Sequence, residues 1–254
     1  MAGLLEGKQA LVLGIANKWS LAYAIAQAFS REGARLTLSY LGEHQKEGIE
    51  SLAEGLAVDR LLPCDVTRDE DLAALSAGLE GKRLDAVIHS LAFANREDLG
   101  RPFVETSRAG FLLAQDVSAY SLVAVARAAA PHMKEGGSIT TLTYVGSTRV
   151  IPNYNVMGVA KASLEASVRY LANDLGAAKI RVNAISAGMV KTASARAIRN
   201  SSTMLPVMAE RAPLRRNTDP AEVADTAVFL ASPLGRGVTG NVLFVDAGLQ
   251  IMGL

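Results

Sequence analysis

The chain contains little cysteine and no excess of charge. Cys64 is the single cysteine among 254 residues, so no internal disulfide can form, and we expect a reducing compartment, the cytoplasm. Lys and Arg number 26 against 25 Asp and Glu, and the net charge of +1 gives no general reason to expect a nucleic acid or an anionic membrane as partner. We therefore expect neither partner, and we assign no metal site; Cys64 is interpreted as a small buried hydrophobic residue.

Long apolar runs and targeting patterns are also missing. No uninterrupted apolar run reaches the roughly 18 residues of a membrane span, and Arg127 breaks the most apolar stretch, residues 122–130. The first residues lack the charged-then-apolar order of a signal peptide. The chain instead has length and hydrophobicity, with 50% hydrophobic residues, which suffices for one large core. We expect a single domain over residues 1–254.

Segments typical of buried strands alternate with helical segments. We expect strands at residues 8–14, 35–40, 61–66, 85–90, 137–143, 179–188 and 242–246. Helices are expected at residues 20–30, 47–56, 68–79, within 110–133, and at 154–175 and 219–231. This alternation predicts an α/β fold, a doubly wound Rossmann-type domain with a seven-stranded parallel sheet. The helix within 110–133 has few charges, and part of it is interpreted as a subunit interface.

The first strand, loop and helix have the order of a dinucleotide-binding unit. Gly14 permits a tight turn, and the helix beginning at Ser20 offers free amides, and the Ser20 hydroxyl, to a pyrophosphate. The full G-x-G-x-x-G pattern is absent, since position 16 is Ala and position 20 is Ser. A purely structural strand-to-helix turn is an equal alternative.

The second strand ends in Ser39-Tyr40-Leu41-Gly42-Glu43, with no acidic residue at its tip and no arginine for a 2′-phosphate. NADH is therefore the predicted cofactor, with NADPH a less favoured alternative suggested by His44 and Lys46. Near the end of the third predicted strand, Asp65 could accept a hydrogen bond from the adenine amino group, with Val66 against the ring. Asp65 could instead cap the next helix.

Two later strand ends would complete the cofactor site. Small residues at 91–95 would let a ribose and a nicotinamide lie close to the backbone, and Thr192 lies where a carboxamide could find partners. His89 falls within a strand and is expected to be a packed core histidine. Residues 193–208 have no clean period, and a small substrate lid is expected at about residues 190–210. Arg211, Arg215 and Arg216 form a cluster that is either solvated or binds an anionic partner.

Two tyrosines and a lysine are the candidate chemical groups. Tyr154 and Lys161 are seven residues apart, about two helical turns, so both side chains share one face of the predicted helix. The lysine could bind sugar hydroxyls, and its charge could favour a hydrogen bond from the phenol or its ionisation. Tyr144 directly follows a strand. The alternative is that both tyrosines pack in the core and Lys161 extends its amine to solvent.

The chain resembles the short-chain dehydrogenase/reductase superfamily, and within it the bacterial NADH-dependent enoyl-[acyl-carrier-protein] reductases. The resemblance covers essentially the whole chain and is most specific at residues 89–94, 152–166 and 181–188. The Tyr-x6-Lys spacing of Tyr154 and Lys161 is similar to this family, whereas ordinary members of the superfamily use Tyr-x3-Lys; position 158 is Gly. Met189 and Lys191 depart from the Pro and Arg usual in the family, and basic residues of the lid are fewer.

The resemblance implies reduction of a trans-2-enoyl thioester on acyl carrier protein by NADH in fatty acid elongation, and a homotetramer. It implies that Tyr154 stabilises the enolate, Lys161 binds the nicotinamide ribose, Tyr144 lines the acyl pocket and Ala94 contacts substrate. The cofactor set that it implies is Gly14, Ser20, Leu21, Asp65, Val66, Ser90, Leu91, Ala92, Lys161, Val190, Lys191, Thr192, Ala193 and Ser194. The alternatives are an alcohol–ketone dehydrogenase of the superfamily and a non-catalytic NAD-binding protein.

Overall fold

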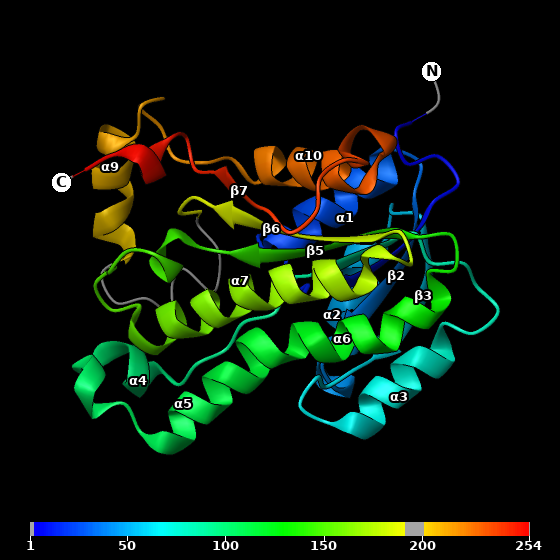
Figure 1. Ribbon diagram of the computed structural model, residues 1–254, viewed down its shortest axis with the longest axis horizontal. Helices are drawn as coiled ribbons and strands as arrows, with labels where there is room; N and C mark the ends of the chain where they lie inside the picture. The colour runs from blue at the N-terminus through cyan, green and yellow to red at the C-terminus, as the bar shows by residue number, and fades with distance from the viewer. Residues whose placement is uncertain (1–2, 191–200, 254) are drawn as a thin grey trace.

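One seven-stranded parallel sheet organises the computed structural model, which describes residues 3–190 and 201–253 (Figure 1). The strand order is β3-β2-β1-β4-β5-β6-β7, which confirms the predicted doubly wound architecture. The strands are β1 (Gln9–Leu13), β2 (Arg35–Tyr40), β3 (Val58–Pro63), β4 (Ala86–His89), β5 (Gly137–Thr143), β6 (Ile180–Ala187) and β7 (Val242–Val245).

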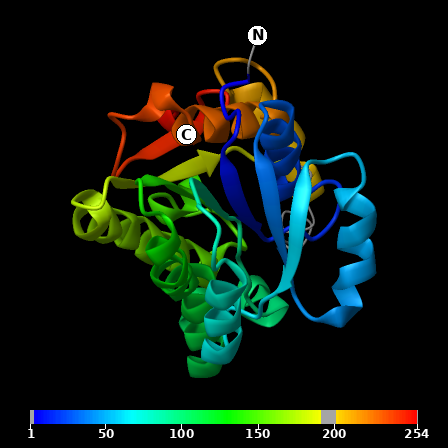
Figure 2. The ribbon, with the colours of Figure 1, turned by 90° about the vertical axis from the view of Figure 1, so that its right-hand side faces the viewer.

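Helices cover both faces of the sheet, and the side chains of each strand alternate between the two resulting cores. In β1, Ala10 and Val12 pack with the helices α1 and α10, while Leu11 and Leu13 pack on the opposite face with α3, α6 and α7. Figures 1 and 2 show these two helical layers on either side of the twisted sheet. The helices are α1 (Leu21–Arg31), α2 (Glu43–Ala53), α3 (Asp69–Gly78), α4 (Arg96–Gly100), α5 (Arg108–Gln115), α6 (Ser121–Ala129), α7 (Asn155–Gly176), α9 (Ser201–Arg211) and α10 (Pro220–Ala231).

Several predicted boundaries need correction at the edge of the sheet. The third strand begins at Val58 and ends at Pro63, so residues 64–66 follow it. The polar residues at its start do not fit the apolar pattern of a buried strand, so the start was not predicted. They are tolerated because β3 is an edge strand, and Asp59 forms an ion pair with Arg35 of the neighbouring β2. The helix α2 begins at Glu43, four positions before the predicted start, and the short α4 was not predicted.

The long helical run before β5 is interrupted by a π-helical segment, Asp116–Tyr120, between α5 and α6. By length and composition alone, the run Arg108–His132 could cross a membrane, with a mean hydropathy of 1.4 in its most apolar window, although no uninterrupted apolar run is present. Half of that window is buried inside the fold, and core helices of globular proteins meet the same criterion. The π segment places Ser118 and Ser121 toward the interior, where both are fully buried.

The helix α10 begins as predicted, with a capping box. The Asp219 carboxylate accepts from the Ala221 amide at 2.8 Å, and Glu222 accepts from the Asp219 amide at 2.9 Å. Pro220 occupies the first helical position, where its missing N–H costs nothing. By contrast, α9 was not delimited from the sequence, because Pro206 lies inside it and its residues lack a clean apolar stripe.

Candidate active site

The chain reverses its winding direction between β1 and β4, and the predicted cofactor turn lies at this point. β2 and β3 lie on one side of β1, and β5 to β7 lie beyond β4. Gly14 follows β1 with a positive φ of 96°, and a Cβ there would lie 2.1 Å from the Ser90 carbonyl oxygen. Only glycine permits the ends of β1 and β4 to approach so closely. The crevice in which doubly wound sheets bind ligands lies just beyond these two strand ends.

The first turn of α1 faces this crevice after a tightly bonded loop. Asn17 accepts through its carbonyl from both the amide and the hydroxyl of Ser20, at 3.1 and 2.7 Å. The Ser20 hydroxyl thus donates within the loop. Its contact with a phosphate remains a prediction. The helix begins at Leu21, and its first-turn amides are the groups left for a pyrophosphate.

An acidic residue of α2 lies beside the end of β2. Glu43 opens α2, and Tyr40 at the end of β2 donates its hydroxyl to the Glu43 carboxylate at 3.2 Å. Burial, followed by this carboxylate, raises the pKa of Tyr40. The preference of acidic residues for the first turn of a helix was the available signal. The tip of β2 itself has no acidic residue, as predicted, and the carboxylate beside it belongs to α2.

Asp65 lies in a turn after β3 and does not cap α3, so that alternative is wrong. Its carboxylate accepts from the amide and hydroxyl of Thr67 at 3.0 and 2.7 Å. Arg68 occupies the N-cap position of α3, and among the described residues no side chain caps that end. Val66 is buried beside it. Cys64 is buried as predicted, and burial raises the pKa of its thiol to about 12.

The loop after β4 is fixed by the π-helical segment. Ser118 accepts from the Phe93 amide at 2.9 Å and donates to the Phe93 carbonyl at 3.0 Å. This fixes the loop that contains Ser90, Leu91, Ala92 and Ala94, and Ala94 packs in the same small core as Tyr144 and Tyr154. The sequence did not single out Ser118, since a serine inside an apolar helix has many possible roles.

His89 is a core histidine, as predicted. Its side chain is fully buried, and its two ring nitrogens are hydrogen-bonded to Thr141 and Ser121 at 2.9 and 2.8 Å. Burial, followed by the charge of Lys161, lowers the pKa of His89 to about 3. A histidine that stays neutral and enclosed by two hydroxyls is a structural group.

The structure brings Tyr144, Tyr154 and Lys161 to the carboxyl edge of the sheet. Tyr154 immediately precedes α7, and its ring meets the edge of Tyr144 with centroids 5.1 Å apart and an interplanar angle of 73°. Two turns further along, the Lys161 ammonium donates to the Leu142 carbonyl of β5 at 2.8 Å. Lys161 is 5% exposed, so the alternative of a lysine extending to solvent is wrong.

Two glycines make this packing possible. A Cβ at Gly146 would lie 2.5 Å from the Tyr154 ring, and a Cβ at Gly158 would lie 2.7 Å from the Gly146 carbonyl oxygen. The start of α7 therefore lies directly on the short helical turn Val145–Ser147. This contact fixes the Tyr154 ring between Tyr144 and the backbone.

Burial determines the protonation of all three groups. It raises the pKa of Tyr154, with smaller effects of Tyr144 and Glu165 in the same direction. It raises the pKa of Tyr144 to about 12, assisted by Asp246, and it lowers the pKa of Lys161 to about 8, opposed by Glu165. Both phenols therefore stay protonated near neutral pH and can donate a hydrogen bond, whereas ionisation of the phenol by Lys161 is not supported.

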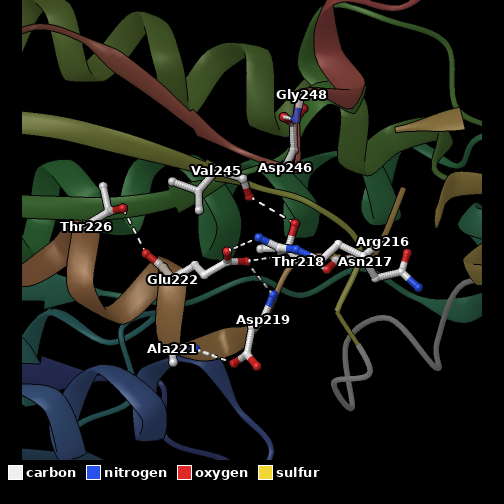
Figure 3. Close-up of polar contacts among 10 residues, drawn as sticks. All are labelled: Arg216, Asn217, Thr218, Asp219, Ala221, Glu222, Thr226, Val245, Asp246 and Gly248. Atoms are coloured by element: carbon white, nitrogen blue, oxygen red, sulfur yellow. Dashed lines mark hydrogen bonds and ion pairs between the residues drawn. The ribbon is translucent and has the colours of Figure 1, made fainter. Parts of the chain in front are cut away.

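The end of β6 is bonded to β7. The Gly188 amide donates to the Val245 carbonyl at 2.8 Å. The Thr218 hydroxyl donates to the same carbonyl at 3.2 Å (Figure 3). Met189 and Val190 follow and are buried. A cavity of about 680 Å³ opens between these residues, Ser20 and the start of α10. The predicted cofactor residues Lys191, Thr192, Ala193 and Ser194 lie outside the described residues.

The arginine cluster is largely engaged within the protein. Arg216 forms an ion pair with Glu222 of α10, with nitrogen–oxygen distances of 2.5 and 2.8 Å (Figure 3). This pairing, with the Asp219 amide, lowers the pKa of Glu222 to about 2. Arg215 donates to the carbonyl of Glu210. Over residues 3–190 and 201–253, no group of three His, Cys, Asp or Glu side chains could hold a metal ion.

The glycine turn at the reversal point, the helix N-terminus beside it and the Tyr154–Lys161 pair define a class: a dinucleotide-dependent oxidoreductase of the short-chain dehydrogenase/reductase type. The family model for enoyl-(acyl carrier protein) reductase matches residues 14–250. The chain belongs to the enoyl-(acyl carrier protein) reductase family.

Similar proteins are known from several bacteria. The NADH-type enoyl-[acyl-carrier-protein] reductase FabI of Bacillus cereus is 54% identical over 98% of this chain and 99% of its own length. That of Bacillus subtilis is 51% identical, covering 97% of both chains. A crystal structure of the Bacillus cereus reductase with NADP+ and indole naphthyridinone superposes with a TM-score of 0.97, at 54% identity, covering 99% of this chain and 100% of that one.

A structure of the Anaplasma phagocytophilum reductase with NAD has a TM-score of 0.96 at 44% identity, covering 100% of this chain and 98% of that one. These matches confirm the predicted family, fold class, oxidoreductase activity and role in fatty acid elongation. They also confirm NADH as the favoured cofactor, although Staphylococcus aureus relatives at 49% identity are named for NADPH.

Proposed function

We propose that Tyr154, Tyr144 and Lys161 reduce the trans-2 double bond of an enoyl thioester presented by acyl carrier protein. One observation supports this most directly: a protonated phenol at the start of α7 and a buried ammonium two turns along that helix lie at the carboxyl edge of the sheet, beside the end of β5. The phenol can donate to an oxygen that gains negative charge, and the ammonium can bind sugar hydroxyls.

A dinucleotide fits the residues of the crevice. Gly14 packs against the Ser90 carbonyl oxygen, where any Cβ would clash, and the loop that follows leads to the N-terminus of α1 at Leu21, whose amides can bind a pyrophosphate. Bound NADH supplies a hydride for the β-carbon of the substrate. The residues proposed to contact the cofactor are Gly14, Ser20, Leu21, Asp65, Val66, Ser90, Leu91, Ala92, Lys161, Val190, Lys191, Thr192, Ala193 and Ser194.

Tyr154 has the central role in the proposed reaction. As the β-carbon gains hydride, negative charge develops on the thioester oxygen, and the Tyr154 hydroxyl donates to it. The Lys161 ammonium, held by the Leu142 carbonyl, binds the hydroxyls of the nicotinamide ribose and so orients the nicotinamide ring. The α-carbon then gains a proton from the tyrosine hydroxyl or from water, as the enolate carbonyl re-forms, which gives the saturated acyl thioester. Tyr144 and Ala94, which pack with Tyr154, form the wall of the acyl pocket.

We also infer a single catalytic domain over residues 1–254, with a lid at about residues 190–210, acting as a cytoplasmic homotetramer. The substrate lid includes α9, where Met208 lies 4.0 Å from the Tyr144 hydroxyl. Exposed apolar side chains on the helical layer that includes α5 and α7, Leu112, Tyr120 and Val159, support contact between subunits. The buried Cys64 thiol is consistent with a reducing cytoplasm.

The test is Tyr154→Phe, assayed by loss of NADH absorbance with crotonyl and longer enoyl thioesters. Loss of a donor aimed at a developing oxyanion should lower kcat by about 10²- to 10³-fold. The matched control is Tyr170→Phe, which removes the hydroxyl of a 74% exposed tyrosine on the same helix. Near-normal turnover by Tyr154→Phe would refute the role of this hydroxyl. Oxidation of a secondary alcohol without thioester activity would favour an alcohol dehydrogenase.

A further inference from the structure

Glu165 is a buried carboxylate on the active-site side of α7, and the reaction proposed above does not use it. It is 8% exposed and lies four residues after Lys161, one turn along the same face of the helix. Burying a carboxylate without partners is costly, and so is burying an ammonium. Two opposite charges one turn apart can offset each other's cost.

Two consecutive residues of β5 bind these two groups. The Leu142 carbonyl accepts from the Lys161 ammonium at 2.8 Å, and the Thr143 hydroxyl donates to the Glu165 carboxylate at 2.7 Å. All these groups are buried. The end of β5 thus fixes lysine and glutamate together, and neither side chain can leave its place without losing a buried hydrogen bond.

We propose that Glu165 is a positioning residue for Lys161: it supplies the buried counter-charge that keeps the ammonium protonated and directed at the cofactor ribose. This inference rests on the proposed role of Lys161 in binding the cofactor. Glu165 itself contacts neither cofactor nor substrate in this role.

The other titratable groups around Lys161 cannot provide this charge. His89 on β4 is neutral, because burial and Lys161 itself lower its pKa to about 3. Tyr144 and Tyr154 stay protonated, since burial raises the pKa of each. Asp246, after β7, acts on Tyr144. Among the described residues, Glu165 is the one carboxylate that raises the pKa of Lys161 against the effect of burial.

The experiment uses Glu165→Gln in the full chain, which removes the negative charge of the side chain and keeps its shape. The titration of Lys161 is followed by NMR of ¹³C-labelled lysine, assigned by Lys161→Arg, and NADH affinity is measured by fluorescence at several pH values. The midpoint, about 8 in the unmodified chain, should fall by about one pH unit. NADH binding at pH 8 should then weaken by about fivefold, in proportion to the protonated fraction.

The control is Asp174→Asn, which removes one negative charge from an exposed position near the other end of α7 and should leave the midpoint unchanged. Glu165→Asp keeps the charge but withdraws it by one methylene, so it should shift the midpoint in the same direction by less. If Glu165→Gln does not fold, Glu165→Asp decides the question. A midpoint that is unmoved or raised overturns the inference.

This result is independent of the proposed reaction. The Lys161 midpoint is measured without substrate, so a shift in Glu165→Gln supports the pairing even if Tyr154→Phe keeps full activity. If the midpoint shifts but NADH affinity stays the same at every pH, the link from Glu165 to cofactor binding is wrong. An unchanged midpoint together with an inactive Tyr154→Phe overturns the pairing and leaves the proposed reaction intact.

Discussion

Gly146→Ala should damage the active site although residue 146 contacts neither cofactor nor substrate in the proposed mechanism. The added Cβ would lie 2.5 and 2.8 Å from two carbons of the Tyr154 ring and 3.3 Å from the Tyr144 ring. A Cβ contact below 3.0 Å forces one of the groups to move. Tyr154 has little room, because Tyr144 meets it edge-on and α7 begins directly after it.

The magnitude follows from this overlap. Relief requires a ring displacement of roughly 1 Å, and a misplacement of that size can lower kcat/KM by about 10²-fold. Overpacking of this kind also costs about 1–3 kcal/mol of the free energy of unfolding. The control is Gly176→Ala at the end of α7, where a Cβ would meet nothing within 4 Å.

The assay combines kcat/KM for an enoyl thioester with urea unfolding of both variants. Gly176→Ala should keep full activity and stay at least as stable, since alanine is favoured over glycine in a helix by up to about 1 kcal/mol. If Gly146→Ala retains kcat/KM within threefold, the fixed position of the Tyr154 ring is not needed for catalysis. If it loses activity only in step with unfolding, the effect is one of stability alone.

Three further outcomes are expected. Thr140→Val should raise the free energy of unfolding by about 1 kcal/mol or more, because the buried Thr140 hydroxyl has no hydrogen-bond partner among the described residues. Thr141→Val should lower the free energy of unfolding, because it removes a hydrogen bond to His89. Urea unfolding that ranks the two variants in the opposite order contradicts this prediction. The pKa of His89 falls from 6.5 to about 3 on folding, so the unfolded chain binds more protons between these two pH values. The free energy of unfolding should therefore drop as the pH falls through this range, by up to about 1.4 kcal/mol per pH unit. In His89→Gln this dependence of the free energy of unfolding on pH should be weaker. Glu43→Gln should raise kcat/KM with NADPH relative to NADH by about tenfold, since a carboxylate beside the adenosine ribose repels a 2′-phosphate, and an unchanged ratio would place Glu43 away from the ribose.

The sheet could be predicted because its strands are buried on both faces. Ala10-Leu-Val-Leu13 is apolar at every position and could hardly be anything but a central strand or a buried helix segment. The same criterion failed at β3, where Asp59 and Arg60 interrupt the apolar run. The strand forms there because β2 supplies pairing on one side and the other side is an edge, and this is a property of the assembled sheet.

The end of β2 shows how local sequence can mislead about where a helix begins. The sequence shows Glu43 three residues after Tyr40, but the helix was expected to begin at residue 47, whereas α2 begins at Glu43. A glycine followed by an acidic residue is a common start of a helix, so the signal was present. What could not be predicted is that the Tyr40 hydroxyl reaches this carboxylate, since that depends on how α2 turns back onto the end of β2.

The side of α7 that contains Lys161 shows what helical periodicity can and cannot predict. Tyr154 and Lys161 could be predicted to share one face of a helix from their spacing of seven residues. Glu165, four residues further along, was not singled out from the sequence. Periodicity does not tell what faces this side of the helix. Leu142 and Thr143 bind the lysine and the glutamate only because the strand order places β5 under α7, and Gly146 lets the chain pass close enough for Tyr154 to pack. The protonation of Lys161, and with it the proposed binding of the cofactor, therefore depends on a strand that carries no charge of its own.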